Sequence, residues 1–263
     1  MNYDEKKLKR LNSILQSMGN IMVAFSGGVD SSFLLCAAGR ITGCNVTAVT
    51  IRTPYIPKWE IDEAKAFAEH YGINHSLLNL DMPQNIIHNP QERCYLCKTI
   101  LFSELRKLAD KNNAVLVDGS NFDDISDYRP GLRALKELDV RSPLMEAELT
   151  KTDIRAISEE WNLPTYNKPA YACLLTRIPF GTEITPEILH RIEIAETALI
   201  NIGFPAVRVR HHDDLARVEL PPEDIARAIK YREKVADILK KSGYRFAALD
   251  LDGYRMGSLN PQK

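Results

Sequence analysis

The feature that most constrains the fold is an apolar run that ends abruptly in a glycine turn. Residues 21–25 read Ile-Met-Val-Ala-Phe, and residues 26–32 read Ser-Gly-Gly-Val-Asp-Ser-Ser before an amphipathic stretch begins. This order predicts a strand, a tight turn and a helix N-terminus. Two glycines let the backbone turn sharply and approach a ligand closely. Since the N–H groups and the dipole of a helix N-terminus favour an anion, the sequence predicts an anion-binding loop here.

The polar residues of this loop refine its chemistry. Ser26, Ser31 and Ser32 add hydroxyl donors beside Gly27 and Gly28. Asp30 would repel a phosphate unless a cation such as Mg²⁺ were also bound, so Asp30 is a candidate Mg²⁺ ligand. The loop lacks the Gly-Lys-Ser/Thr ending of a Walker P-loop. An ordinary turn followed by a pair of N-cap residues is the structural alternative.

Strands and helices alternate through the first two thirds of the chain. The apolar patterns predict strands at 21–25, 45–51, 74–80 and 114–117, and helices at 4–18, 32–40, 58–71 and 97–111. Such alternation implies βαβ units and a Rossmann-like, parallel, doubly wound sheet. Ligands bind at the carboxyl ends of parallel strands. We therefore expect Thr50, Gly119 and Asn121 to lie at the same edge as the glycine loop and to bind the same cofactor.

The pattern changes toward the C-terminus. A helix at 150–161, with Lys151 in its first turn, is followed by an irregular stretch at 165–181. Beyond it we expect a helix at 186–202, a hairpin of 206–210 and 215–220, a helix at 223–241 and a strand at 245–251. That order predicts a small α+β domain with an antiparallel sheet. We place the two domains at residues 1–181 and 182–263.

Composition limits the partners and the location. The 263 residues carry a formal net charge of −1, so the chain shows no global basic footprint for nucleic acid. We find no apolar stretch of the ~18 residues that a membrane span needs and no apolar segment typical of a signal peptide near the N-terminus. We therefore expect a cytoplasmic protein with neither a nucleic-acid nor a membrane partner.

The five cysteines fall into two groups. Cys36 lies on the apolar face of the first helix after the glycine loop and Cys44 lies in a turn, so both are expected to be structural. Cys94 and Cys97 form a Cys-x-x-Cys motif at a predicted helix N-terminus, where the pKa of a thiol is lowered. Cys173 lies in the irregular stretch.

Three interpretations of the Cys-x-x-Cys motif compete. A thioredoxin-like dithiol is the default for a cytosolic βαβ protein. A structural zinc ion needs four ligands, which Cys173 and His88 would have to complete. A [4Fe–4S] cluster on Cys94, Cys97 and Cys173 would leave one iron open for an exogenous ligand.

Several segments carry a resemblance to known families. The Ser-Gly-Gly-x-Asp-Ser motif resembles the PP-loop of the ATP pyrophosphatases. Four further segments, residues 92–98, 172–179, 207–211 and 251–258, resemble the LarE family. Those ATP-dependent sulfur transferases make the nickel-pincer nucleotide cofactor of lactate racemase. The resemblance covers essentially the whole chain and implies an adenine nucleotide alpha hydrolase-like fold.

The resemblance also implies roles for individual residues. Arg208 and Arg210 would bind the phosphate of the substrate nucleotide, because alternate residues of a strand share a face; from the residues alone, a solvated strand face is the alternative. Cys173 would be the nucleophile and sulfur donor. Asp124 and Glu219 are further candidates for the Mg²⁺ site. The loop residues that would hold the phosphates of ATP and the Mg²⁺ ion are Ser26, Gly27, Gly28, Asp30, Ser31 and Ser32.

The family has two types, which differ in their sulfur source. In one, a single cysteine gives up its own sulfur; in the other, three cysteines hold a [4Fe–4S] cluster and the protein turns over. With cysteines at 94, 97 and 173, this chain resembles the cluster type. The resemblance implies pyridinium-3,5-biscarboxylic acid mononucleotide as substrate, sulfide or another sulfur donor, other nickel-pincer biosynthesis proteins as partners, and a homo-oligomer.

Three other functions compete with this one. A tRNA thiolase of the same superfamily would also combine a PP-loop with cysteines. An amidating synthetase of the NAD or GMP synthetase type would share the ATP site but would not need Cys94, Cys97 or Cys173. A non-enzymatic protein, in which zinc joins two domains, would release no pyrophosphate.

Overall fold

The computed structural model describes residues 3–125 and 130–255, which form two compact units. The first unit comprises residues 1–83 and 92–171, and the second comprises residues 84–91 and 172–263. The predicted boundary at 181/182 is a different division of the chain and stays a prediction. The two units are described separately below.

The first unit is built on a parallel sheet with the strand order β3-β2-β1-β4. Its strands are β1 (Asn20–Ala24), β2 (Asn45–Arg52), β3 (Asn74–Asn79) and β4 (Val115–Val117). Val23 of β1 is in register with Ala48 of β2 and with Val117 of β4. The predicted Rossmann-like parallel sheet is confirmed.

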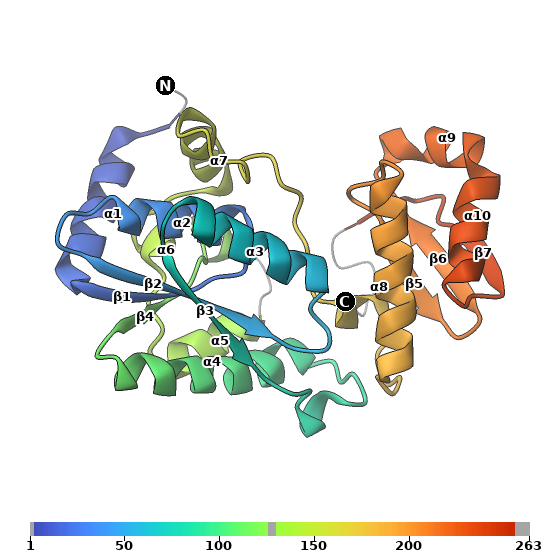
Figure 1. The fold of residues 1–263 in the computed structure, drawn as a ribbon, viewed down its shortest axis with the longest axis horizontal. Helices are drawn as coiled ribbons and strands as arrows, with labels where there is room; N and C mark the ends of the chain where they lie inside the picture. The colour runs from blue at the N-terminus through green and yellow to red at the C-terminus, as the bar shows by residue number, and fades with distance from the viewer. Residues whose placement is uncertain (1–2, 126–129, 256–263) are drawn as a thin grey trace. The chain divides into compact units, whose positions relative to one another are not determined.

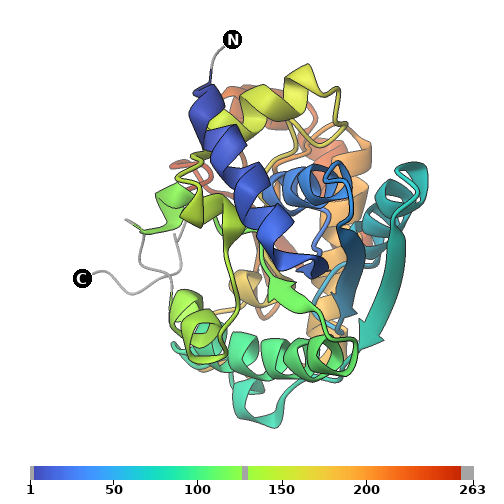
Figure 2. The same ribbon diagram turned by 90° about the vertical axis from the view of Figure 1, so that its left-hand side faces the viewer.

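Helices cover both faces of this sheet (Figures 1 and 2). Residues of the first face, among them Val23, pack with α1 (Glu5–Met18), α2 (Val29–Gly39), α3 (Lys58–His70) and α7 (Lys151–Glu160) in one large core. On the other face, Met22, Val49 and Leu116 pack against Leu105 and Ala109 of α4 (Arg93–Lys111). The shorter α5 (Pro130–Glu137) packs on α4, and α6 (Pro143–Glu146) packs near α1. Both sheet faces are therefore buried, as a parallel sheet requires.

Two helices begin earlier than the sequence predicts. The predicted start of a helix at Ser32 is wrong, because the extended Gly28 is the N-cap and α2 begins at Val29. The predicted start at Cys97 is also wrong, because α4 begins at Arg93. Asp30 and Ser31 consequently lie in the first turn of α2, and both Cys94 and Cys97 lie inside α4.

The second unit has a three-stranded sheet of order β5-β6-β7 with three helices. Strands β5 (Arg208–His212) and β6 (Leu215–Glu219) form the predicted hairpin, after α8 (Pro186–Asn201). The predicted fully antiparallel sheet is wrong, since β7 (Phe246–Leu249) runs parallel to β6. The helical crossover between β6 and β7 allows this direction. That crossover is two helices, α9 (Pro222–Lys230) and α10 (Arg232–Lys241), rather than one.

The short segment 84–91 belongs to the second unit through Asn89. This asparagine is fully buried, and its amide donates to the carbonyls of Ile178 at 2.8 Å and Pro179 at 3.0 Å. The backbone carbonyl of Asn89 accepts a hydrogen bond from the N–H of Gly181 at 3.2 Å. Asn89 therefore fixes the chain that follows Cys173.

Replacing Asn89 with alanine is expected to destabilise the protein by about 2 to 3 kcal/mol, because two buried carbonyls lose their donor. Chemical denaturation followed by far-UV circular dichroism measures this change. Asn162→Ala is the matched control, because Asn162 has a similarly positive φ (56° against 46° for Asn89) but is exposed. Equal destabilisation by the two substitutions would show that backbone strain, and not loss of the buried amide, lowers the free energy of unfolding.

Candidate active site

The glycine loop connects β1 to α2 and packs closely on α3. Gly27 has a φ of +71°, and a Cβ at this position would lie 3.0 Å from Cβ and 3.2 Å from Cα of Ala64. A side chain at residue 27 is therefore excluded both by the backbone conformation and by the neighbouring helix. Gly28 follows in an extended conformation and leads directly into the helix.

The first turn of α2 presents the donors that the sequence predicts. The N–H groups of Val29, Asp30 and Ser31 have no intrahelical acceptor at this helix end, whereas that of Ser32 donates to the Gly28 carbonyl at 3.0 Å. The hydroxyl oxygens of Ser26 and Ser31 are 3.1 Å apart. Ser32 is fully buried, and its hydroxyl has no hydrogen-bond partner among the described residues. A helix N-terminus of this kind can hold a phosphate group.

The turn after β4 packs against the same helix end. A Cβ at Gly119 would lie 3.0 Å from the backbone nitrogen of Ser31. Asn121 donates its amide to Asp30 Oδ1 at 3.4 Å. The structure thus brings Gly119 and Asn121 to the glycine loop, because β1 and β4 are neighbours in the parallel sheet.

Asp30 also forms a close ion pair with Lys151, the first residue of α7. Lys151 is not among the residues that the sequence predicts for the site, although a cation at a helix N-terminus opposes the helix dipole and is in that sense a signal. Its backbone N–H donates to Asp123 at 2.8 Å. The pair places one negative and one positive side chain at the mouth of the loop.

The Thr50 hydroxyl has two partners within the fold. It donates to the carbonyl of Phe25 at 2.7 Å and lies 2.8 Å from His75 Nε2. Because that hydroxyl proton is used, Nε2 of His75 donates to Thr50. Burial lowers the pKa of His75, which favours this neutral form. The Thr50 hydroxyl therefore positions the end of β1 and offers no donor to a ligand.

The acidic residues near the loop are held within the fold. Asp124 accepts the backbone N–H of Asn121 at 3.1 Å, and Asp118 accepts from Ser120 at 2.5 Å and from Ser142 at 2.6 Å. Glu219, in the second unit, pairs with Arg210 and Arg217. Among the described residues, no three His, Cys, Asp or Glu side chains are grouped as a metal site. Asp124 and Glu219 thus have structural partners in this structure.

Cys94 lies in the first turn of α4, and Cys97 lies at the start of the second turn. Cys94 is exposed, whereas Cys97 is partly buried with its sulfur 3.1 Å from the hydroxyl oxygen of Tyr55. Burial raises the pKa of Cys97, while the hydrogen bond to Tyr55 opposes the rise. The predicted lowering of the pKa is therefore wrong for Cys97, because desolvation of its thiolate by burial is the largest contribution.

The two remaining cysteines of the first unit differ from this pair. Cys36 is buried in the large core beside the sheet, and burial raises its pKa to about 11. Cys44 is half-buried, and burial raises its pKa as well. Neither thiol is therefore prone to ionise at neutral pH.

Cys173 is held in the second unit by Arg177. The guanidinium of this almost fully buried arginine donates to the carbonyls of Ala172 at 2.7 Å and Cys173 at 3.2 Å. It also forms two hydrogen bonds of 2.9 Å with the carboxylate of Glu196. Glu196 in turn accepts the N–H of Val209 at 2.8 Å. Cys173 as a residue is partly exposed, so the arginine fixes its backbone without burying it.

Arg177 and Glu196 are not among the residues that the sequence predicts for the site. They are 19 residues apart, and the bond joins a short 3₁₀ turn to the middle of α8. Such a contact leaves no periodic signal. The arginine could have been noticed only as a charge inside an otherwise apolar stretch that follows Cys173.

Arg208 and Arg210 lie on β5 and are both buried, so the alternative of a solvated strand face is wrong. Arg210 contacts Glu219 at 2.5 Å and donates to the carbonyl of Thr176 at 2.6 Å. The Arg208 guanidinium lies 5.1 Å from the centroid of the Tyr254 ring. Burial and the nearby charge of Arg177 lower the pKa of Arg208. An anion at this place would relieve that repulsion.

One sequence motif lies partly outside the described residues. The motif at 251–258 continues beyond Arg255 into residues that are not described. Within the described ranges, no helix is both long and apolar enough to span a membrane.

Comparison with known proteins assigns the family. A family model described as asparagine synthase matches residues 11–100, which include the glycine loop. Over 97% of its length, the chain is 38% identical to pyridinium-3,5-bisthiocarboxylic acid mononucleotide synthase of Lactiplantibacillus plantarum, of which the match covers 94%. It is also 39% identical to an uncharacterised protein of Synechocystis, over 97% of both chains. An uncharacterised protein of Methanocaldococcus jannaschii is 37% identical over 95% of this chain and 98% of the relative.

These similarities extend through both compact units, and the matched region includes the parallel sheet with the Ser-Gly-Gly-x-Asp-Ser loop at its carboxyl edge. They decide between the sulfur transferase and the other functions that the sequence left open. The chain belongs to the LarE family of ATP-dependent sulfur transferases, within the PP-loop superfamily of ATP pyrophosphatases.

Proposed function

We propose that this chain adenylylates a carboxylate of pyridinium-3,5-biscarboxylic acid mononucleotide and converts it to a thiocarboxylate for nickel-pincer nucleotide synthesis. The observation that carries the proposal is the 38% identity, over nearly the whole chain, with a synthase named for the bisthiocarboxylic acid mononucleotide. The client of the cofactor would be a lactate racemase. Association into a homo-oligomer and with other proteins of the route are parts of the same proposal.

The first step makes the carboxylate reactive. A carboxylate is a poor electrophile because it is already an anion. Its oxygen attacks the α-phosphorus of ATP, the bond to the bridging oxygen breaks, and pyrophosphate leaves. The amides at the start of α2 and the loop backbone are suited to stabilise the charge that develops on pyrophosphate. Ser26 and Ser31, with hydroxyls 3.1 Å apart, add donors at the same place.

A Mg²⁺ ion fits the donors at this loop. Mg²⁺ is commonly held by one or two carboxylates together with substrate phosphates and water. The single carboxylate of Asp30, in the first turn of α2, matches that pattern for an ion that arrives with ATP. Lys151 adds a fixed positive charge beside Asp30. When bound, the ion would supply further neutralisation of the leaving pyrophosphate.

The second step transfers sulfur. A sulfur nucleophile attacks the carbonyl carbon of the acyl adenylate, the bond to the phosphate oxygen breaks, and AMP leaves with the bonding electrons. With hydrosulfide as the nucleophile, the proton is released and a thiocarboxylate remains. Cys173 is the residue proposed to present the sulfur, because its backbone is fixed by Arg177 and the residue is partly exposed.

The cysteines fit an iron–sulfur cluster in their donor chemistry. Three thiolates on a [4Fe–4S] cluster leave one iron open. Cys94 and Cys97 are three residues apart in α4, so their side chains share one side of the helix. Neither is fully buried. With Cys173 as the third ligand, the cluster would supply an open iron for an exogenous hydrosulfide.

Arg208 and Arg210 are proposed to bind the phosphate of the substrate mononucleotide. Guanidinium groups bind phosphate with paired hydrogen bonds. They are also more weakly hydrated than an ammonium group, so less hydration free energy is lost when they are buried. Burial lowers the pKa of Arg208, and the neighbouring charge of Arg177 lowers it further. A phosphate would offset this positive charge.

Metal analysis of protein purified and reconstituted without oxygen tests the sulfur source. We expect about four irons and four sulfides per chain, lost in each of C94S, C97S and C173S. The matched control is C44S, because Cys44 is a half-buried thiol of the first unit with no assigned role. Absence of iron in the wild-type protein, or retention of a full cluster in all three variants, would contradict the cluster.

A further inference from the structure

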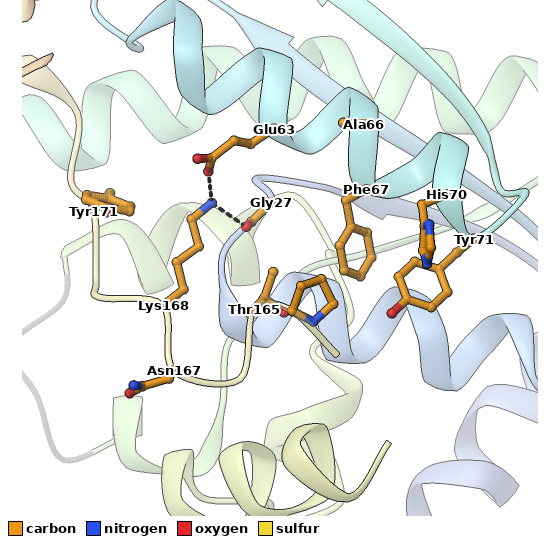
Figure 3. A pocket seen from close by; sticks show the side chains of 11 residues that line it. Gly27, Glu63, Ala66, Phe67, His70, Tyr71, Thr165, Asn167, Lys168 and Tyr171 are labelled. Carbon is orange, nitrogen blue, oxygen red and sulfur yellow. Dashed lines mark hydrogen bonds and ion pairs between the residues drawn. The ribbon is translucent and has the colours of Figure 1, made fainter. Parts of the chain in front are cut away.

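A groove of about 560 Å³ lies beside the glycine loop, between α3 and the chain that follows α7 (Figure 3). Residues 164–171 form one wall and include a lysine whose side chain points back to the loop. No residue of the segment 164–171 has a role in the chemistry described above. The residues that line the groove include Gly27, Glu63, Phe67, Tyr71, Thr165 and Lys168.

Lys168 connects the loop to α3. Its ammonium nitrogen lies 3.0 Å from the carbonyl oxygen of Gly27 and 2.6 Å from a carboxylate oxygen of Glu63. The Lys168 side chain is only 14% exposed, although that of Glu63 is 53% exposed. A nearly buried ammonium bound to a backbone carbonyl is a charge-assisted hydrogen bond, which is among the stronger kinds.

The backbone around Lys168 is itself fixed. Arg155 of α7 donates to the carbonyls of Tyr166 at 2.6 Å and Lys168 at 2.9 Å. The ring of Tyr171 meets Trp59 of α3 edge-on, with centroids 4.8 Å apart. The lysine is therefore held at both ends of its segment, and its contact with Gly27 is part of the packed structure of the first unit.

The contact between Lys168 and the Gly27 carbonyl also affects the orientation of the Gly28 N–H, because both belong to the same peptide group. The C=O of Gly27 and the N–H of Gly28 lie in one plane and point in opposite directions. Fixing the carbonyl on the groove side consequently turns the N–H of Gly28 toward the inside of the loop, where it lies 3.4 Å from the hydroxyl oxygen of Ser26. A bound cation on the carbonyl also polarises that N–H, as in other hydrogen-bond chains.

We propose that Lys168 is a positioning residue for the phosphate loop, which orients the Gly27–Gly28 peptide so that its N–H binds the pyrophosphate part of ATP. Lys168 acts through the backbone and does not touch the nucleotide. The inference rests on the proposed ATP site and is independent of the sulfur source.

Binding of two probes, the magnesium complex of α,β-methylene-ATP and inorganic pyrophosphate with Mg²⁺, tests the role by isothermal titration calorimetry. In K168M, both affinities are expected to fall about tenfold, because a charge-assisted hydrogen bond that orients a donor is lost. Adenosine should bind as it does to the wild type. K168R, which keeps a cationic donor, should recover most of the loss.

The matched control is K65M. Lys65 also pairs with a glutamate of α3, but that pair with Glu69 is exposed and 3.7 Å long. Its loss should leave both affinities unchanged. If Lys168 had only a structural role, K168M would have a lower melting temperature. Its affinity for pyrophosphate would then fall no more than its affinity for adenosine.

Wild-type affinity for pyrophosphate in folded K168M would overturn the inference. If K168M does not fold, K168Q replaces it, since glutamine keeps a neutral donor, and the expected loss is about threefold; unchanged affinity again overturns the inference. Failure of the wild-type protein to bind either probe would instead contradict the proposed ATP site.

Discussion

Replacing Cys173 with alanine is expected to abolish thiocarboxylate formation while ATP-dependent release of pyrophosphate continues. Removal of a nucleophile typically costs at least about a thousandfold in turnover. The glycine loop and its supporting residues belong to the first unit, whereas Cys173 belongs to the second, so adenylylation should not depend on its thiol. Pyrophosphate release and thiocarboxylate are measured in the same reaction, by a coupled assay and by mass spectrometry.

The control for this result is C44A. Cys44 is partly buried, as Cys173 is, but it lies in a turn before β2. This variant should keep both activities. Repeated formation of thiocarboxylate by the C173A variant would exclude Cys173 both as sulfur donor and as an essential cluster ligand.

Replacing Arg177 with methionine is expected to destabilise the protein by about 3 to 5 kcal/mol, because the substitution leaves the buried carboxylate of Glu196 without its cation. Two backbone carbonyls next to Cys173 lose their donor as well. Both tryptophans, Trp59 and Trp161, belong to the first unit. Far-UV circular dichroism in urea, rather than tryptophan fluorescence, is therefore the signal to follow.

Two comparisons make this prediction specific. R255M removes an arginine from an exposed pair with Asp252 in the same unit, and its effect should stay within about 0.5 kcal/mol. The double variant R177M/E196Q should be more stable than R177M alone, since no buried charge is left unpaired. A loss of less than about 1 kcal/mol in R177M would contradict a large contribution of this buried ion pair to stability.

The elements that the sequence predicted correctly are those with a local signal. Alternating apolar runs and the Gly27–Gly28 turn placed four strands in a parallel sheet, with the loop at its carboxyl edge. Neighbouring parallel strands end at the same edge, and so Gly119 could be placed near Ser31 from the chain order alone. The helix starts were less accurate, because Gly28 and Glu92 are not strong N-cap residues.

What the sequence did not reveal depends on pairing between distant residues. Lys151 and Asp30 are 121 residues apart, and Lys168 and Gly27 are 141 apart. Side-chain contacts at such separations leave no periodic pattern in the chain. The same holds for Asn89, which assigns residues 84–91 to the second unit, and for β7, whose direction is set by the preceding helices.

The most direct test of the central proposal uses isotopically labelled sulfide. Protein reconstituted without oxygen is incubated with the biscarboxylic acid mononucleotide, ATP, Mg²⁺ and the labelled sulfide, and the product is analysed by mass spectrometry. We predict a product in which a labelled sulfur replaces a carboxylate oxygen, formed repeatedly per chain, with equal amounts of AMP and pyrophosphate. A mononucleotide that keeps all its carboxylate oxygens while ATP is bound would contradict the proposed sulfur transfer to this substrate.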